Sequence, residues 1–303
     1  MKIAYLILAY KDPKQLKRLT DRLSKTGDCY VHLDKKSDKR SFDNVLHGNH
    51  GVNVFSRYIV SWAGWSMVKA YFYLMHRAYE SDNKYDRFVL LTGLDYPLMS
   101  DAEMLREFSE HLDTEYIMAY NIATSTVPTD KNKVLKKWYL DTPFRPKFLQ
   151  RVYKSLMYRC LTKPFSGKQI KVRLGGNYVD PYFGQTLSAF TRAAVKVLIE
   201  TYDNDKQFNK RMKHVHAPDE IYWHTIIFNS NFRKNTIQNG EEHEITEHFG
   251  WAPLHYHTYT VFTSVYQKEH FDELINSGYM FCRKVETGIS DALLDKIDEY
   301  REK

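Results

Sequence analysis

Residues 1–33, MKIAYLILAYKDPKQLKRLTDRLSKTGDCYVHL, decide the fold class of this chain. They open with an unbroken apolar run at 3–9, which is typical of a strand buried on both faces of a parallel sheet. Asp12 and Pro13 then supply a helix N-cap and a first-turn proline, and leucines recur after them at helical spacing. A second apolar run at 30–33 predicts the next strand. The stretch therefore predicts a strand–helix–strand unit of a parallel sheet.

The same alternation continues through the next ninety or so residues. Apolar runs at 52–55, 88–91 and 116–119 predict further strands, and helical patterns cover 65–79 and the segment that Ser100 caps. This order is typical of an open, largely parallel α/β sheet flanked by helices. The later half carries mainly helical patterns.

No linker rich in glycine, proline or serine divides the chain. We therefore predict a single domain over 1–303, with a nucleotide-binding half at 1–120 and an acceptor-binding and catalytic half at 121–303.

The composition is that of a globular protein with an anionic partner. Hydrophobic residues make up 43% of the chain, and the formal net charge of +7 favours a nucleotide, a nucleic acid or a lipid surface. No stretch approaches the roughly 18 apolar residues of a membrane span. The three cysteines are far apart and suggest no disulfide framework, so a cytoplasmic setting is expected.

Two aspartates follow predicted strands directly. Asp34 comes after the second strand and Asp95 after the strand at 88–91. Because open parallel sheets bind ligands at the carboxyl ends of their strands, both side chains are expected at one crevice. Each is equally compatible with capping the next loop.

The segment His216-Ala-Pro-Asp-Glu220 places two carboxylates at the start of an apolar helix. Proline and acidic residues both suit a first helical turn, so the pattern is compatible with an ordinary helix start. It is equally compatible with an ionised carboxylate that takes a proton from a bound hydroxyl.

The stretch from Lys131 to Arg173 is rich in lysine and arginine, and Asp141 is its only acid. Within 145–163 the apolar residues repeat at the spacing of an amphipathic helix. Such a helix either packs its apolar stripe on the domain or lies on an anionic membrane surface.

Seven segments, in order, resemble the core-2/I-branching β-1,6-N-acetylglucosaminyltransferases and their peptide O-xylosyltransferase relatives. The likeness runs from residue 1 to about residue 298 and indicates a short, bacterial-type member. The segments are MKIAYLILAYKDPKQLKRL, YVHLDKKS, WAGWSMVKAYFYLM, FVLLTGLDYPLMS, FGQTLSAFTRAAV, HAPDEIYWHTI and FDELINSGYMFCRKV.

The resemblance implies a GT-A type nucleotide-sugar-binding fold and transfer with inversion at the anomeric carbon. It implies that Glu220 is the catalytic base, and that the donor is a UDP-sugar carrying N-acetylglucosamine, xylose or, in some members, glucuronic acid. It also implies that no metal is needed. Consistent with this, Asp95 lacks the second carboxylate of an Asp-X-Asp metal motif, so the protein must supply the positive charge, for which Arg283 and Lys284 are the candidates.

By match to the family, Asp34 is expected to accept hydrogen bonds from the nucleotide and Trp62 to pack beside it. Tyr10 lies where the base should sit, and Asp95 lines the same site. Relatives carry a further cationic residue that contacts the diphosphate. In this chain His257 is the candidate for that contact, with His255 and Lys268 as alternatives. On the acceptor side we expect Asp219 and Trp251, although Trp251 is equally compatible with a core position.

Two other classes remain open at this point. A metal-dependent hydrolase would use His214 and His216. A non-catalytic protein would use the basic stretch to bind a membrane or nucleic acid.

We favour a metal-independent inverting glycosyltransferase that moves N-acetylglucosamine or xylose from UDP to a glycan or lipid-linked glycan. It would serve cell-surface polysaccharide synthesis in the cytoplasm, with peripheral contact to the inner face of the membrane through 145–163. No metal, other cofactor or nucleic-acid partner is expected.

Overall fold

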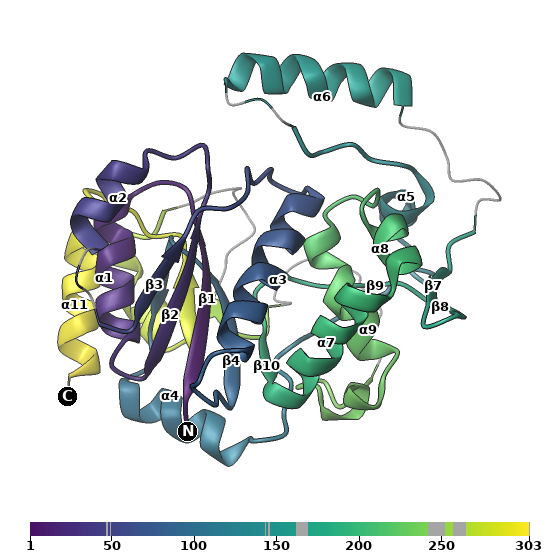
Figure 1. Ribbon diagram of the computed structural model, residues 1–303. Coiled ribbons are helices and arrows are strands. Elements are labelled where there is room, and N and C mark those ends of the chain that lie inside the picture. The colour runs from purple at the N-terminus through teal and green to yellow at the C-terminus, as the bar shows by residue number, and fades with distance from the viewer. Residues whose placement is uncertain are drawn as a thin grey trace.

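A five-stranded sheet forms the centre of the protein in a computed structural model (Figure 1). The structure describes residues 1–46, 48, 50–142, 144, 146–161, 169–241, 252–256 and 265–302. The sheet has the order β10-β4-β1-β2-β3, in which β1 to β4 run parallel and β10 is antiparallel to β4. Its strands are β1 (Ile3–Ala9), β2 (Gly27–Leu33), β3 (Val52–Phe55), β4 (Arg87–Thr92) and β10 (Ala189–Thr191).

Helices cover both faces of this sheet (Figure 1). The helices of the described residues are α1 (Pro13–Leu23), α2 (Lys39–Leu46), α3 (Trp65–Tyr79), α4 (Asp101–Glu110), α5 (Pro128–Leu135), α6 (Lys147–Leu161), α7 (Arg192–Asn204), α8 (Lys206–Met212), α9 (Tyr222–Phe228), α10 (Phe271–Ile275) and α11 (Asp291–Arg301). None of them combines the length and the apolar character that a membrane crossing requires.

Strand β1 shows why the sheet is covered on both sides. Successive side chains of a strand point to opposite faces. Tyr5 and Ile7 face the cluster formed with α1 and α11, whereas Leu6 and Leu8 face the cluster formed with α3 and α7. The α/β fold with a mostly parallel sheet, expected from the sequence, is thereby confirmed.

The strand order changes direction at β1, because β2 and β3 lie on one side of it and β4 on the other. Ligands of open α/β sheets bind at such a switch point, beyond the carboxyl ends of the strands. Here those ends carry the segment after Ala9, then Asp34, and then the turn from Thr92 to Asp95.

A three-stranded sheet joins distant parts of the chain in the order β11-β12-β5. These strands are β11 (His255–Tyr256), β12 (Phe281–Arg283) and β5 (Asp95–Pro97). Two-stranded sheets pair β6 (Tyr120–Asn121) with β9 (Tyr182–Phe183) and β7 (Val172–Leu174) with β8 (Asn177–Val179).

One predicted strand is wrong. Residues 116–119 do not extend the central sheet, and only an isolated bridge joins Tyr116 to Ala189. The edge position next to β4 is taken instead by β10, from the later half of the chain. Tyr116, Ile117 and Ala119 are buried although the run forms no strand, since burial alone does not require a β ladder. The division at residue 120 remains a prediction, although strands from both sides of it share the central sheet.

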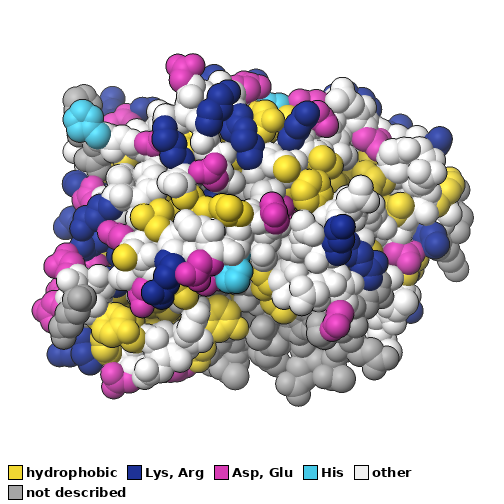
Figure 2. Space-filling model, turned by 90° about the horizontal axis from the view of Figure 1, so that it is seen from below, with side chains coloured by type: hydrophobic (Ala, Val, Ile, Leu, Met, Phe, Trp, Pro, Cys, Tyr) yellow, Lys and Arg dark blue, Asp and Glu magenta, His cyan; other side chains and the backbone are white. Residues whose placement is uncertain are grey.

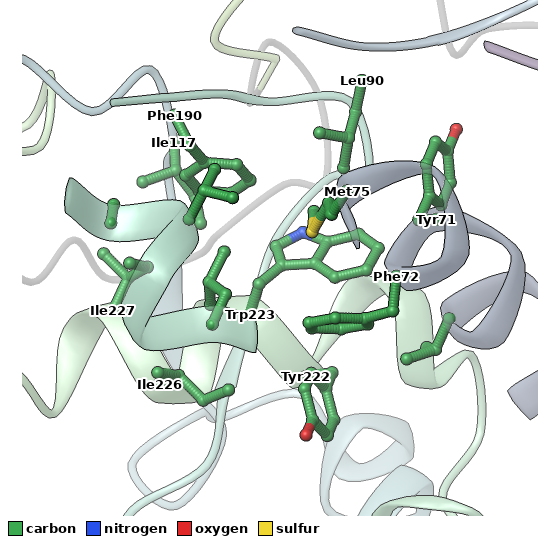
Figure 3. Close-up of a cluster of buried hydrophobic side chains, with 14 of the residues drawn as sticks. Tyr71, Phe72, Met75, Leu90, Ile117, Phe190, Tyr222, Trp223, Ile226 and Ile227 are labelled. Carbon is green, nitrogen blue, oxygen red and sulfur yellow. The ribbon is translucent and has the colours of Figure 1, made fainter. Parts of the chain in front are cut away.

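A cluster of large side chains fixes α9 against α3 (Figure 3). The Trp223 indole is fully buried and packs edge-on against Tyr71, with ring centres 5.8 Å apart. Phe72 packs in the same way against Tyr222, at 5.3 Å. Large aromatic residues contribute most to such cores. This packing holds the start of α9, and with it the residues just before Tyr222, in one position.

Candidate active site

The two carboxylates of the 216–220 segment lie on a short 3-10 turn, Pro218–Glu220, that leads into α9. Ala217 enters the turn with φ of 49°, in the left-handed region, and Pro218 occupies its first position. The predicted helix start is therefore present, but its first turn is the tighter 3-10 type. Every residue of α9 is buried, so the turn is anchored directly by the core.

A second anchor comes from Gly184, whose N–H donates to the backbone carbonyl of Glu220 at 2.9 Å. A Cβ at this position would lie 2.0 Å from the carbonyl oxygen of Met118 and 2.6 Å from the His224 ring. Only glycine allows the chain to approach so closely, and the approach fixes the backbone of Glu220.

Burial raises the proton affinity of both carboxyl groups. The buried Asp219 accepts a hydrogen bond from the Thr186 hydroxyl at 2.7 Å, while its Oδ1 has no partner among the described residues. Burial raises the pKa of Asp219 to about 6. Burial, followed by repulsion from Asp219, raises the pKa of Glu220 to about 8. A carboxylate of this kind is a stronger base than one in water.

Two cations oppose this rise in the pKa of Glu220, namely Lys133 and Arg283. Lys133 projects from α5 and pairs with Asp130 at 3.3 Å, and its ammonium lies 3.3 Å from the centre of the Phe183 ring. Sequence reasoning missed Lys133, because a single lysine on a short helix carries no signal of proximity to a carboxylate. Thr186 was also missed, although it lies inside the quoted segment FGQTLSAFTRAAV.

Asp95 and Arg283 face each other across the antiparallel pair of β5 and β12. The Asp95 Oδ1 lies 3.5 Å from the Arg283 Nε, and its Oδ2 lies 3.2 Å from the His255 Nε2. The N–H and hydroxyl of Thr92 also donate to this carboxylate, at 2.7 and 2.6 Å. Complete burial by itself would raise the pKa of Asp95. His255, Arg283 and Thr92 outweigh this effect, so the pKa of Asp95 is lowered.

Asp95 is fully buried, and its hydrogen bonds are to other groups of the protein. Its two oxygens already accept hydrogen bonds from Thr92 and His255, and Arg283 lies within ion-pair distance without a hydrogen bond from its Nε. Burial lowers the pKa of His255, which lies against the Asp95 carboxylate. The role of His255 as the further cation of the family stays a prediction. The contact of Asp95 with the nucleotide-sugar stays a prediction.

Positive charge gathers beside Arg283. Burial, Arg283 and Lys11 lower the pKa of Lys284, which shows that these cations are close enough to repel each other. Lys11 follows β1 and forms an ion pair with Glu286 at 2.6 Å. Such a group of cations, held without full neutralisation, favours a bound anion.

Asp34 lies buried at the carboxyl end of β2. Its Oδ1 accepts hydrogen bonds from the backbone N–H groups of Lys36 and Val60, at 3.0 and 3.2 Å. The carboxylate therefore fixes the loop that precedes Trp62. Trp62 is 74% exposed and Tyr10 is 57% exposed, so both aromatic rings are available to a ligand at this edge.

Arg283 links the two parts of the site, because it lowers the pKa of Glu220 and also forms an ion pair with Asp95. Asp219 lies next to Glu220 and raises its pKa further. Lys284 joins this group through Arg283. Trp251 and His257 lie outside the described residues.

Within the described part of the chain, the histidines proposed for a hydrolase do not form a metal site. His214 packs against Tyr139 and His216 against Trp138, with ring centres 4.8 Å apart in both pairs. Among the described residues, no group of three or more histidine, cysteine, aspartate or glutamate side chains is placed to hold a metal ion.

Relatives found by sequence comparison are named for different glycosyl transfers. Human "Xylosyltransferase 2" is 25% identical over 246 residues, which cover 79% of this chain and 26% of that protein. Arabidopsis thaliana "Beta-glucuronosyltransferase GlcAT14C" is 24% identical over 98% of this chain and 73% of that protein. A Bos taurus β-1,6-N-acetylglucosaminyltransferase is 23% identical over 74% of this chain and 48% of that protein. The chain thus spans about a quarter of the length of xylosyltransferase 2.

The family itself is shown by a match over most of the chain. The model of the Core-2/I-branching enzyme family matches residues 3–275, which include Glu220, Asp219, Asp95 and Asp34. The match favours neither the hydrolase nor the non-catalytic alternative. The chain belongs to the Core-2/I-branching enzyme family.

Proposed function

We propose that this protein is an inverting glycosyltransferase of the GT-A type that uses a UDP-sugar. The donor sugar is N-acetylglucosamine or xylose, and the acceptor is a hydroxyl of a glycan or lipid-linked glycan. The family match supports the reaction class. The chemistry rests on one observation, that Glu220 and Arg283 interact electrostatically. The pKa of Glu220 is raised, as a base requires, and Arg283 lies beside a second cation, Lys284.

In the proposed reaction, Glu220 takes the proton of the acceptor hydroxyl while that oxygen bonds to the anomeric carbon of the sugar. The bond from this carbon to the UDP oxygen breaks, and UDP leaves with the electron pair. Attack opposite the leaving group inverts the anomeric centre. A general base of this kind contributes about 10²- to 10⁴-fold to the rate.

Arg283 and Lys284 neutralise the charge that develops on the departing diphosphate. Arginine binds phosphate oxygens with two parallel N–H groups, and lysine adds a compact point charge. Asp95 and His255 orient Arg283 from behind, through the contact of Asp95 with its Nε. Cations fixed before the reaction stabilise the transition state without reorganisation. We propose that they replace a bound metal.

At the carboxyl edge of the sheet, the base and ribose of UDP would lie between Trp62 and Tyr10, next to Asp34. The exposure of both rings supports this placement. Asp219 would contact the acceptor. We propose that the protein acts in the cytoplasm in the synthesis of a cell-surface polysaccharide.

A thermal-shift series tests the proposal. UDP and UDP-sugars should raise the melting temperature by mass action, whereas CDP and GDP should not. Among UDP-GlcNAc, UDP-xylose, UDP-glucuronic acid, UDP-glucose and UDP-galactose, the true donor should give the largest shift. No shift with any uridine nucleotide, at concentrations that saturate a known UDP-sugar enzyme, would exclude the proposed function.

A further inference from the structure

Helix α6 stands away from the body of the protein (Figure 1). Several of its large apolar side chains are exposed. The side chains of Phe148, Val152 and Leu156 are 71%, 49% and 56% exposed. They lie four residues apart, so they form one stripe along the helix. An exposed stripe of large apolar side chains marks an interaction surface.

The stripe does not face the domain. The partly buried residues of α6 (Gln150, Tyr153, Lys154 and Met157) recur at helical spacing on the opposite side. From α6, Tyr153 contacts Phe144 and Tyr158 contacts Trp138, with ring centres 5.8 and 6.0 Å apart. Of the apolar stripe predicted from the sequence, Tyr153 and Met157 are therefore partly buried, whereas Phe148, Val152 and Leu156 are exposed.

The charge around the stripe has one sign. Helix α6 contains Arg151, Lys154 and Arg159 and no acidic residue. Lys154 lies within electrostatic reach of Lys36 and Asp141, which places α6 beside the adjoining surface of the domain.

That adjoining surface is also basic. It holds a cavity of about 770 Å³ whose lining includes Lys35, Arg57, Lys69 and Lys213. The acid of this cavity, Asp141, accepts hydrogen bonds from the N–H and hydroxyl of Ser66, at 3.1 and 2.6 Å. The opposite end of the protein is different, because Figure 2 shows basic and acidic side chains interspersed there.

We propose that α6 and the basic cavity form a docking surface for an anionic lipid bilayer. The stripe of Phe148, Val152 and Leu156 would enter the boundary between headgroups and acyl chains, and the surrounding cations would pair with lipid phosphates. Nucleic acid would use the cations but would leave the apolar stripe in water. A second copy of the chain would bury the stripe but would bring the like charges of α6 together.

Docking at α6 places a defined end of the molecule at the membrane. Figure 1 shows α6 beyond the end of the sheet at which β1 finishes, the end that also carries Tyr10 and Asp34. The candidate site would then open toward the bilayer, which suits an acceptor carried on a lipid. This orientation rests on the proposed function, whereas the docking itself does not.

Vesicle flotation of the full chain tests the docking. The protein should bind vesicles of phosphatidylcholine with about a third phosphatidylglycerol, and bind pure phosphatidylcholine at least roughly tenfold more weakly. A triple variant with Phe148→Ser, Val152→Ser and Leu156→Ser should lose at least about tenfold in vesicle affinity. The matched control carries Leu112→Ser, Tyr178→Ser and Ile289→Ser, which are exposed positions outside α6, and should bind like the wild type.

Charge reversal gives an independent arm. The double variant Arg151→Glu with Arg159→Glu should bind anionic vesicles more weakly than the wild type. The difference should grow as ionic strength falls, because repulsion between the new glutamates and the lipid phosphates is then less screened. The UDP-induced melting shift should persist in all these variants, which separates failed docking from a failed site. The proposal is overturned by equal binding to both vesicle types, by unchanged binding of the α6 triple variant, or by duplex DNA binding at the same salt that the triple variant retains.

Discussion

The Asp95 carboxylate lies 3.5 Å from the Arg283 Nε, directly across an antiparallel strand pair. The two residues are far apart in the chain, and the pairing of β5 with β12 brings them together. Asp95 is fully buried and Arg283 is partly exposed, so the carboxylate holds the guanidinium from the protein side and leaves its outer edge accessible. An aspartate that follows a strand thus pairs with an arginine from a distant part of the chain.

Asp95→Asn should weaken UDP binding by roughly tenfold or more, because a neutral amide holds Arg283 less firmly than a charged partner does. The donor KM should rise more than kcat falls. Calorimetric titration with UDP checks the affinity. Asp101→Asn is the matched control, since Asp101 also pairs with an arginine, Arg301, at 2.6 Å, but at the start of α4. Equal loss of UDP affinity in both variants would contradict the role of Asp95.

Glu220→Gln should lower kcat by about 10²- to 10⁴-fold, because the amide cannot take the acceptor proton. UDP affinity should change little. Transfer assays with the donor found by thermal shift give kcat, and Glu200→Gln, an exposed change on α7, provides the control. A Glu220→Gln variant with near wild-type kcat would remove Glu220 from the mechanism.

The pKa of Glu220 predicts the pH dependence of the wild type. Because the ionised form is the active base, kcat/KM should rise with pH and level off above a pKa of about 8. A profile that is flat from pH 6 to 9 would contradict a base with this pKa.

The same pKa has a consequence for stability. The pKa of Glu220 is about 8 in the folded protein, against 4.5 for the ordinary group. The folded state therefore binds the proton more tightly, and the contribution of Glu220 to stability falls as pH rises from about 4.5 to 8. Glu220→Gln should accordingly melt at a higher temperature than the wild type, by a margin that grows across this interval. A margin that shrinks with rising pH would be the opposite result.

Two tryptophans separate stability from binding. Trp223 is fully buried and Trp62 is 74% exposed. Trp223→Ala should reduce the free energy of unfolding by about 3–5 kcal/mol, because it leaves a cavity in the core. Trp62→Ala should change that free energy by less than about 0.5 kcal/mol but should weaken UDP binding. Urea unfolding and UDP titration of both variants measure the two effects. Unchanged UDP binding by Trp62→Ala would exclude the Trp62 ring from the nucleotide site.

Transfer should not respond to chelation. With fixed cations on the diphosphate, saturating EDTA should leave the initial rate unchanged. A rate that collapses in EDTA and returns with manganese would show that a metal, and not Arg283 with Lys284, carries the charge.

Much of the architecture could be predicted from local sequence signals. The apolar run at Ile3–Ala9 forms the predicted central strand, and Asp12 caps α1 by accepting from the N–H of Gln15 at 3.1 Å. Ser100 forms the predicted cap of α4 together with Glu103. The failed strand at 116–119 shows the limit, because an apolar run reports burial but not which strand occupies the neighbouring position.

The candidate site divides in the same way. The sequence by itself placed two carboxylates on a proline-led turn before an apolar helix, and placed an amphipathic basic helix at α6. Only the tertiary structure put Lys133 near Glu220, set Arg283 against Asp95, and left the stripe of α6 in solvent. Caps and apolar periods act between residues a few positions apart, so a sequence records them. The contacts of Lys133 and Arg283, and the exposure of α6, depend on how distant segments pack, which no local pattern specifies.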